Sequence, residues 1–424
     1  MKHLFLRIWR WAVWAAIGLL LLSLDNSVRH LNPAQLAASP YLYNIVEWEF
    51  GNFLSKWTHR LADVLPGGPD REMRLAQIQE YFQLGEEARG LSRDLADAAA
   101  AEEVQRRDDL QARLSDVRSQ RESLRADVEE TIEGGISSVL VDEDLSTLRE
   151  FIFPPVDIRL GNPPKLLITS PRDRIKRTHD VLLRSDVTVR QREDVESRLL
   201  AESDLAALVE DIGGLATYPA SIPTNQTMQW TLQAAAHEWL HHYLFFRPLG
   251  QNMFKNDDMI SLNETVASIA GDELGDRAFV LLGGELPAET GAASQDASGE
   301  TNGQSAEDEE AEQGFSFNRE MRETRLRVDE LLADGEVEQA ERYMEERRQL
   351  FVENGYAIRK INQAYFAFYG TYADTAASVS PIGDQLHRFR SHMPDVGTFL
   401  RTVSGVSSYQ GFLDRLEMLE NDQP

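Results

Sequence analysis

The 424-residue sequence contains no cysteine, which excludes disulfide bonds, thiolate zinc sites, iron–sulfur clusters and cysteine nucleophiles. Any metal would therefore be held by His, Asp and Glu side chains. Basic residues are also scarce, since 43 Lys and Arg stand against 70 Asp and Glu, for a net charge of -27. A chain this acidic is poorly suited to bind a phosphate backbone, so nucleic acid is excluded as the main partner.

The composition nevertheless describes a folded protein. Hydrophobic residues make up 42% of the sequence and aromatic residues 8%, which is enough for a sizeable core. A domain ordinarily spans roughly 100–200 residues, so a chain of this length predicts two or three domains. Long helical patterns mixed with short apolar runs predict an α+β fold that is mostly helical.

The N-terminus has the pattern of a membrane anchor. Lys2, Arg7 and Arg10 precede residues 11–24, which carry no charge and nearly reach the ~20 residues that a bilayer requires. The positive-inside rule predicts a single-pass anchor within residues 1–25 of the inner membrane, with a cytoplasmic N-terminus and an extracytoplasmic (periplasmic) remainder. A cleaved signal peptide and a buried helix are the alternatives, and the cleavage site after residue 23 is weak.

Two helical segments follow this anchor. Residues 26–68 include an amphipathic helix at 41–64 beside the membrane. Residues 69–135 predict a coiled-coil-like arm that ends at Gly134-Gly135, with Arg121 interrupting its apolar spacing. The apolar positions are Leu110, Leu114, Val117, Leu124 and Val128. The arm is either a solvated helix or antiparallel hairpin, or a coiled coil that binds a partner or a second copy.

Residues 136–287 have a mixed texture. Strands are predicted at 151–160, 165–169, 179–189 and 214–221, with a helix at 191–211. Residues 288–314 hold eight acidic residues and no Lys or Arg, which predicts a disordered acidic loop. Residues 315–424 predict a helical subdomain that completes the preceding unit and contains a hairpin turned at Asp334-Gly335.

The strongest motif is the HExxH sequence from His237 to His241, on a helix predicted at 228–246. Residues i and i+4 lie one turn apart on one helix face, so both imidazoles can reach one Zn²⁺. Glu238 projects beside that face, where its carboxylate can take a proton from a metal-bound water. We therefore predict His237 and His241 as zinc ligands and Glu238 as the catalytic base.

A second motif, running from Asn263 to Ala267, lies on a helix predicted at 261–282. In zincins whose third ligand is a glutamate, that residue sits on a second helix, commonly in an NExxA pattern. Glu264 fits this position, 23 residues after His241. Two His, one carboxylate and an open fourth position form the catalytic rather than the structural zinc pattern, so one Zn²⁺ per chain is expected.

The segment AAAHEWLHHYLFF…LNETVASIAGDELG resembles the gluzincin clan of metallopeptidases. More closely, it resembles a bacterial family of membrane-associated predicted aminopeptidases. The resemblance covers residues 136–424 except the acidic loop, is specific at the two motif helices and loose elsewhere, and includes NQAYFAFYGTY in the C-terminal half. It implies a zincin-like unit that hydrolyses peptide or protein substrates. Thermolysin-like relatives place an Asp four residues after the ligand Glu to orient a His, whereas this chain has Ser268; Asp272 is the candidate replacement.

Three tyrosines are candidates for the group that stabilises the oxyanion in such sites: Tyr365, Tyr369 and Tyr372. Their alternative role is an aromatic core at helical spacing. The strand at 214–221 is expected to pair with the backbone of an extended substrate. Asp257 and Asp258 are candidates to grip a substrate's amino terminus.

The remaining histidines, His242, His387 and His392, are expected to be structural.

The sequence leaves two interpretations of function. The first is an active, membrane-tethered zinc metallopeptidase, either an aminopeptidase or an endopeptidase. The second is a non-enzymatic, membrane-tethered coiled-coil scaffold with a zincin-derived binding module. The presence of Glu238 favours the enzyme. Because this residue binds no metal, a non-enzymatic relative would be free to lose it.

Overall fold

The computed structural model describes residues 31–46, 48, 70–101, 103–147, 150–286 and 315–421. The predicted anchor at 1–25, most of the predicted helix at 41–64 and the predicted acidic loop at 288–314 lie outside these residues. Within the described ranges, no helix combines the length and the apolar character needed to cross a bilayer.

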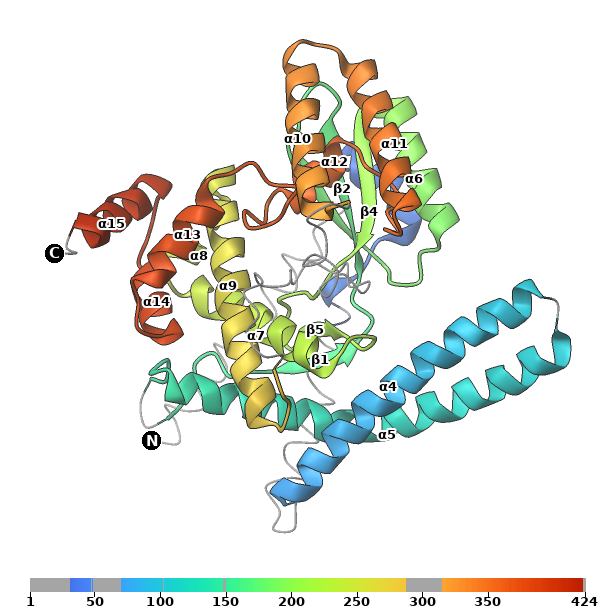
Figure 1. Cartoon of the computed structure of the whole chain (residues 1–424), viewed down its shortest axis with the longest axis vertical. Helices are drawn as coiled ribbons and strands as arrows, with labels where there is room; N and C mark the ends of the chain where they lie inside the picture. Colours follow the sequence, from blue (N-terminus) through green and yellow to red (C-terminus); the bar gives the residue numbers. More distant parts are fainter. Residues whose placement is uncertain are drawn as a thin grey trace, which may run out of the picture.

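Helices dominate the described part of the chain, and short strands form two small sheets (Figure 1). The mostly helical α+β class predicted from the sequence is thus confirmed. In chain order the elements are α2 (Pro33–Ala37), η1 (Ser39–Tyr41), α4 (Arg71–Ala100), α5 (Val104–Asp142), β1 (Ile158–Gly161), β2 (Lys165–Pro171), β3 (His179–Leu183), α6 (Val189–Ser203), β4 (Leu205–Asp211), β5 (Ala220–Pro223), α7 (Met228–Phe245), α8 (Pro248–Gln251), η2 (Met253–Lys255), α9 (Asp257–Leu281), α10 (Phe317–Ala333), α11 (Val337–Glu353), α12 (Gln363–Tyr369), α13 (Ile382–Ser391), α14 (Val396–Val403) and α15 (Tyr409–Asn421).

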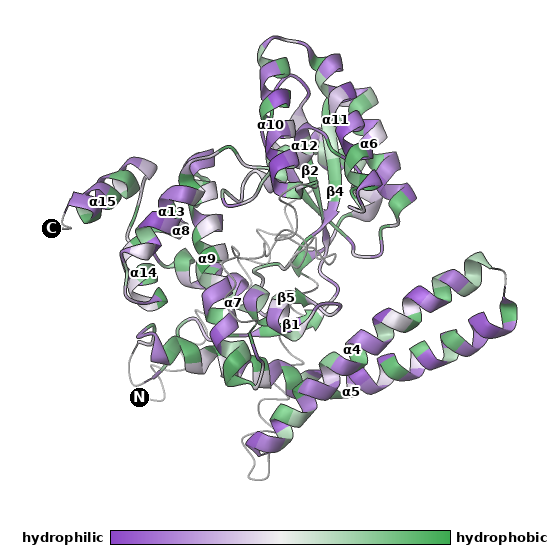
Figure 2. Cartoon of the chain, viewed as in Figure 1, coloured by the Kyte–Doolittle hydropathy of each residue, from purple (hydrophilic) through white to green (hydrophobic). Residues whose placement is uncertain are grey.

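The larger sheet is antiparallel, with strand order β3-β2-β4, and has helices on both faces (Figure 1). Side chains alternate between the faces of a strand. Leu166 and Ile168 of β2 therefore join the core formed with α10, α11 and α12. Leu167 joins the opposite core with α6 and α2. Figure 2 shows the resulting hydrophobic strands between helices of mixed hydropathy.

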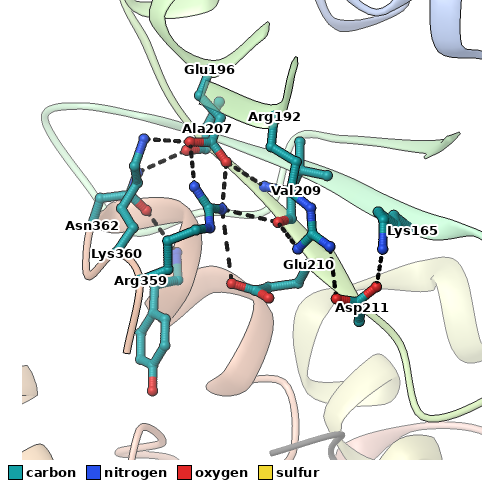
Figure 3. Close-up of polar contacts among 11 residues, drawn as sticks. Lys165, Arg192, Glu196, Ala207, Val209, Glu210, Asp211, Arg359, Lys360 and Asn362 are labelled. Carbon is teal, nitrogen blue, oxygen red and sulfur yellow. Dashed lines mark hydrogen bonds and ion pairs between the residues drawn. The ribbon is translucent and has the colours of Figure 1, made fainter. Parts of the chain in front are cut away.

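A buried carboxylate ties this sheet to the segment before α12 (Figure 3). Glu196 of α6 is 2% exposed. Its oxygens accept hydrogen bonds from the Arg359 guanidinium at 2.7 and 3.0 Å and form an ion pair with Lys360. Glu196 also accepts the backbone N–H of Val209 in β4 at 2.8 Å. Burial alone would raise the pKa of Glu196, but the Arg359 hydrogen bonds and the charges of Lys360 and Arg359 hold it below its usual value.

The second unit is built around α7 and α9, which pack closely because α9 carries small residues on the facing side. A β-carbon at Gly271 would lie 3.0 Å from the Cα of His237, and one at Gly275 would collide with the backbone of Gln233. The main hydrophobic core surrounds this pair and includes the C-terminal half of α5, β1, β5 and α13 to α15. The parallel pair β1-β5 lies beside α7.

Helices α4 and α5 form an antiparallel hairpin that projects from the molecule (Figure 1). Residues Leu91 and Ala98 of α4 pack against Leu110, Leu114 and Val117 of α5. Each helix therefore covers the apolar stripe of the other, as the hairpin alternative predicted. A partner or a second copy bound by the arm stays a prediction.

Arg121 and Gly134-Gly135 do not have the roles that the sequence suggested. The Arg121 guanidinium lies 4.2 Å from the Tyr81 ring centroid and donates to the carbonyl of Thr224, so it joins the hairpin to the loop before α7. The prediction that the arm's helix ends at Gly134-Gly135 was wrong. A β-carbon at Gly135 would lie 2.9 Å from Leu282, so the glycine permits close packing while α5 continues.

Two other predictions need correction. The helix predicted at 191–211 ends at Ser203, because Asp204 adopts φ 52°, and residues Leu205–Asp211 form β4 beside β2. The strand predicted at 214–221 is limited to β5 and an isolated bridge in which Leu215 and Ser221 exchange two backbone hydrogen bonds of 3.0 Å. The hairpin turn at Asp334-Gly335 is confirmed, with φ +75° at Gly335.

Candidate metal centre

Helix α7 brings the two histidines of the HExxH motif together. It begins after Thr227, whose side chain accepts the backbone N–H of Trp230, and it runs without a break through both histidines. The Nε2 atoms of His237 and His241 lie 3.1 Å apart. Both imidazoles therefore present the same nitrogen to one point in space.

Helix α9 supplies the third group. The Glu264 Oε2 atom lies 3.8 Å from Nε2 of His237 and 3.5 Å from Nε2 of His241. The three donor atoms lie within 4.8 Å of one another. Tetrahedral zinc bound through N and O at about 2.0–2.2 Å separates its ligand atoms by about 3.3 Å. The donor set and its spacing thus fit one zinc ion, in agreement with the sequence motifs.

Asn263 fixes the orientation of one candidate ligand, His241. Its Oδ1 lies 3.2 Å from Nδ1 of His241, so it accepts the Nδ1–H, and in the neutral imidazole Nε2 keeps its lone pair for a metal ion. Asn263 is 1% exposed, so water does not compete for this contact. The first residue of the NExxA pattern therefore has a defined role that the sequence alone did not assign.

Glu238 is buried beside the candidate ligands. It is 7% exposed, and a β-carbon at Gly214 would lie 2.8 Å from its Cδ and collide with its Oε1. Only a glycine therefore leaves room for this carboxylate. Burial raises the pKa of Glu238 above its usual value, with the charges of His237 and His241 acting in the opposite direction.

The three candidate metal ligands also interact electrostatically with one another. Burial by itself would lower the pKa of His241, but the adjacent Glu264 carboxylate outweighs it and raises the pKa to about 9. The same contact and those with His237 hold the pKa of Glu264 far below its usual value, although burial acts to raise it. The Glu264 carboxylate therefore stabilises a positive charge on the His241 imidazole, and a bound metal ion would take the place of that proton.

Of the three candidate tyrosines, Tyr372 is the one placed beside this centre. The next residue, Ala373, donates its backbone N–H to Thr265 Oγ1 at 2.9 Å, and Thr265 follows the ligand Glu264 directly. Burial raises the pKa of Tyr372 well above its usual value, and the charges of Glu264 and Glu238 add to this effect. Its hydroxyl therefore stays protonated and can donate a hydrogen bond.

Tyr365 and Tyr369, the other two candidates, lie in the core beneath the sheet. They are 2% and 6% exposed, and their ring centroids are 4.5 Å apart. They correspond to the aromatic-core alternative.

Arg177, from the turn between β2 and β3, was not predicted as a site residue. Its charge lowers the pKa of Tyr372, and it packs over Phe368, whose ring is 6.2 Å from that of Tyr372.

The other predicted residues are distributed around the centre. His242 packs against Tyr218, with ring centroids 5.6 Å apart, and His387 lies exposed on α13. Asp257 and Asp258 are exposed in the first turn of α9, about 10 Å along the helix from Glu264. Asp272 is buried on α9, and its role in orienting a histidine stays a prediction.

Gly214 and Arg177 are the site residues that sequence reasoning missed. The signal for Gly214 was the Gly213-Gly214 pair at the start of the strand predicted at 214–221, since glycine in or next to a strand indicates a close backbone approach. Arg177 had no signal, because its position depends on how the two units pack.

Comparison of the chain with models of protein families, with curated proteins and with solved structures finds no match. The functional assignment consequently depends on the motifs and on the geometry of the site.

Proposed function

We propose that this chain is a zinc-dependent metallopeptidase that hydrolyses peptide bonds. The single observation that carries the proposal is the convergence of His237, His241 and Glu264 within 4.8 Å, with the buried Glu238 carboxylate close enough to interact electrostatically with all three. Three protein ligands leave the fourth zinc position for water or substrate, which distinguishes catalytic from structural zinc.

When bound, zinc supplies Lewis acidity, which polarises a carbonyl and lowers the pKa of a water molecule. Glu238 accepts the proton of the attacking water on its carboxylate and passes it to the nitrogen of the leaving amine.

Two further groups prepare the centre for this reaction. The Tyr372 hydroxyl donates a hydrogen bond to the oxygen of the scissile carbonyl as negative charge develops there. Asn263 holds the His241 imidazole in the tautomer that a metal requires. The zincin-like class of the α7-α9 unit belongs to the same proposal, as does tethering to a membrane through residues 1–25.

The first experiment measures zinc content and peptide hydrolysis of the full-length protein beside two variants. We expect one zinc per chain and hydrolysis in the wild type, and loss of both in His241→Ala. Glu238→Gln should keep its zinc and lose at least about 100-fold in kcat. Absence of zinc from wild type after reconstitution would reject the proposal, and so would full activity of metal-loaded Glu238→Gln.

A further inference from the structure

A cavity of about 560 Å³ opens directly beside the metal centre, and the metal-ligating His241 forms part of its wall. Three segments that are distant in sequence build it. They are the stretch before β1, the loop before β5 and the C-terminal end of α7. The lining residues are Phe153, Pro154, Pro155, Ala216, Tyr218, His241, His242, Phe245 and Phe246.

The lining is apolar and largely aromatic. Phe246 contacts both Phe153 and Phe245, with ring centroids 5.1 Å apart in each pair. The Tyr218 hydroxyl donates to the carbonyl of Pro155 at 3.3 Å, so the structure itself uses this polar group. Among the residues that the structure describes, none that lines the cavity is Asp, Glu, Lys or Arg. A charged side chain would therefore lose its hydration in this cavity without gaining a partner.

The rim of the cavity is unusually apolar for a solvent-exposed surface. Phe153, Phe245 and Phe246 are 46%, 67% and 52% exposed. Contiguous exposed aromatic residues mark a surface that becomes covered by a ligand. Covering these rings would remove apolar area from water, which is the main source of affinity in small-molecule and peptide pockets.

The position of the cavity determines which part of a ligand reaches it. Because His241 is both a metal ligand and a wall residue, a carbonyl held at the metal lies at the mouth of the cavity. Consecutive Cα atoms are about 3.8 Å apart, so the side chain that reaches inward belongs to a residue next to that carbonyl. The loop residue Ala216 has the smallest side chain among the described lining residues.

We propose that this cavity binds a large apolar side chain, aromatic or long aliphatic, of the peptide residue that flanks the scissile bond. The inference rests on the proposed metallopeptidase function and names its substrate class. Phe153, Phe245 and Phe246 are the specificity-determining side chains, and Ala216 keeps the cavity open. Cleavage therefore occurs beside residues such as Phe or Leu.

The test uses the zinc-loaded, full-length protein and a set of peptides that differ at a single position, which carries Phe, Leu, Ala or Asp. We expect kcat/KM for the Phe and Leu peptides to exceed that for Ala by about 10- to 100-fold, with Asp poorest. Ala216→Phe should fill the cavity and move the preference to Ala. Equal cleavage of all four peptides would overturn the proposal, and so would an unchanged preference in Ala216→Phe.

A binding measurement separates this proposal from the proposed function. In the Glu238→Gln background, fluorescence anisotropy of the same labelled peptides reports affinity without hydrolysis. If the zinc-loaded wild type cleaves none of the peptides but the variant binds the Phe peptide selectively, the proposed peptidase function is rejected and the proposed role of the cavity is supported. If the wild type cleaves the peptides with no selectivity in rate or binding, the role of the cavity is rejected and the peptidase function is supported.

Two phenylalanine variants complete the design. Phe245→Ala should weaken binding of the Phe peptide, whereas Phe254→Ala serves as the matched control, because Phe254 is 85% exposed but does not line the cavity. Both variants are also tested against phosphatidylglycerol vesicles. If Phe245→Ala reduces only vesicle association and leaves peptide selectivity unchanged, the aromatic rim serves a lipid surface and the proposal is overturned.

Discussion

Gly214 and Glu238 lie so close together that any β-carbon at position 214 would collide with the Glu238 carboxylate. The contact is with the far end of a side chain, so Gly214→Ala should displace the carboxylate rather than unfold the protein. We expect kcat to fall by about 10- to 100-fold, because misplacing a catalytic group by about 1 Å has this effect. Zinc content and the melting temperature should stay near wild type. Gly213→Ala is the neighbouring control, and equal losses in both variants would contradict the explanation.

The contact between Asn263 and His241 predicts a loss of metal affinity. Asn263→Ala removes the acceptor of the His241 Nδ1–H, and variants of this kind ordinarily bind metal about 10- to 100-fold more weakly. A competition titration with a zinc chelator measures the change. Asn263→Asp keeps an acceptor oxygen and should recover most of the affinity. Wild-type affinity in Asn263→Ala would show that the contact does not hold the ligand.

The tyrosines give a prediction that separates the site from the core. Tyr372→Phe removes the proposed hydrogen-bond donor and should lower kcat by about 10²- to 10³-fold with unchanged zinc content. Tyr369→Phe keeps the packed ring and should leave kcat within a few-fold of wild type. Steady-state kinetics of both variants decide the matter. A larger loss in Tyr369→Phe than in Tyr372→Phe would assign the role to Tyr369 instead.

The buried Glu196 predicts a pH-dependent stability. Its pKa in the folded chain lies below the ordinary value of 4.5, so its contribution is complete above that value and disappears as the pH falls through the folded-state pKa. Glu196→Gln should lower the free energy of unfolding at pH 7 by about 3 kcal/mol, because Arg359 and Lys360 lose their buried counter-charge.

Denaturant unfolding at pH 7 and pH 3 tests this prediction. The difference between wild type and Glu196→Gln should shrink on acidification, since protonated glutamate resembles glutamine. A difference that stays constant between the two pH values would mean that the ion pairs with Arg359 and Lys360 do not stabilise the fold.

The parts of the fold that sequence patterns predicted correctly are those with local causes. The α7 helix follows from uninterrupted helical sequence, and the i, i+4 spacing alone brings His237 and His241 together. The pairing of α10 with α11 follows from a glycine in the left-handed region at Gly335. In each case the interacting residues are neighbours in the chain.

The parts that sequence patterns missed depend on contacts between distant segments. Strand β4 looked like a continuation of α6, and only its pairing with β2 makes Leu205–Asp211 extended. Tyr372 could not be separated from Tyr365 and Tyr369, because the three share one aromatic segment and differ only in what packs against them. Gly135 looked like a helix end because its close neighbour, Leu282, is far along the chain.

Helix α5 belongs both to the arm and to the main core. Because one continuous helix joins them, the arm is held rigidly relative to the core. The helix has 39 residues and is about 58 Å long. Its far end lies at the hairpin tip, whereas its near end is embedded beside α9, and Arg121 braces it against the loop before α7. A protein that bound the hairpin tip would therefore fix the distance and the orientation of the candidate metal centre relative to itself.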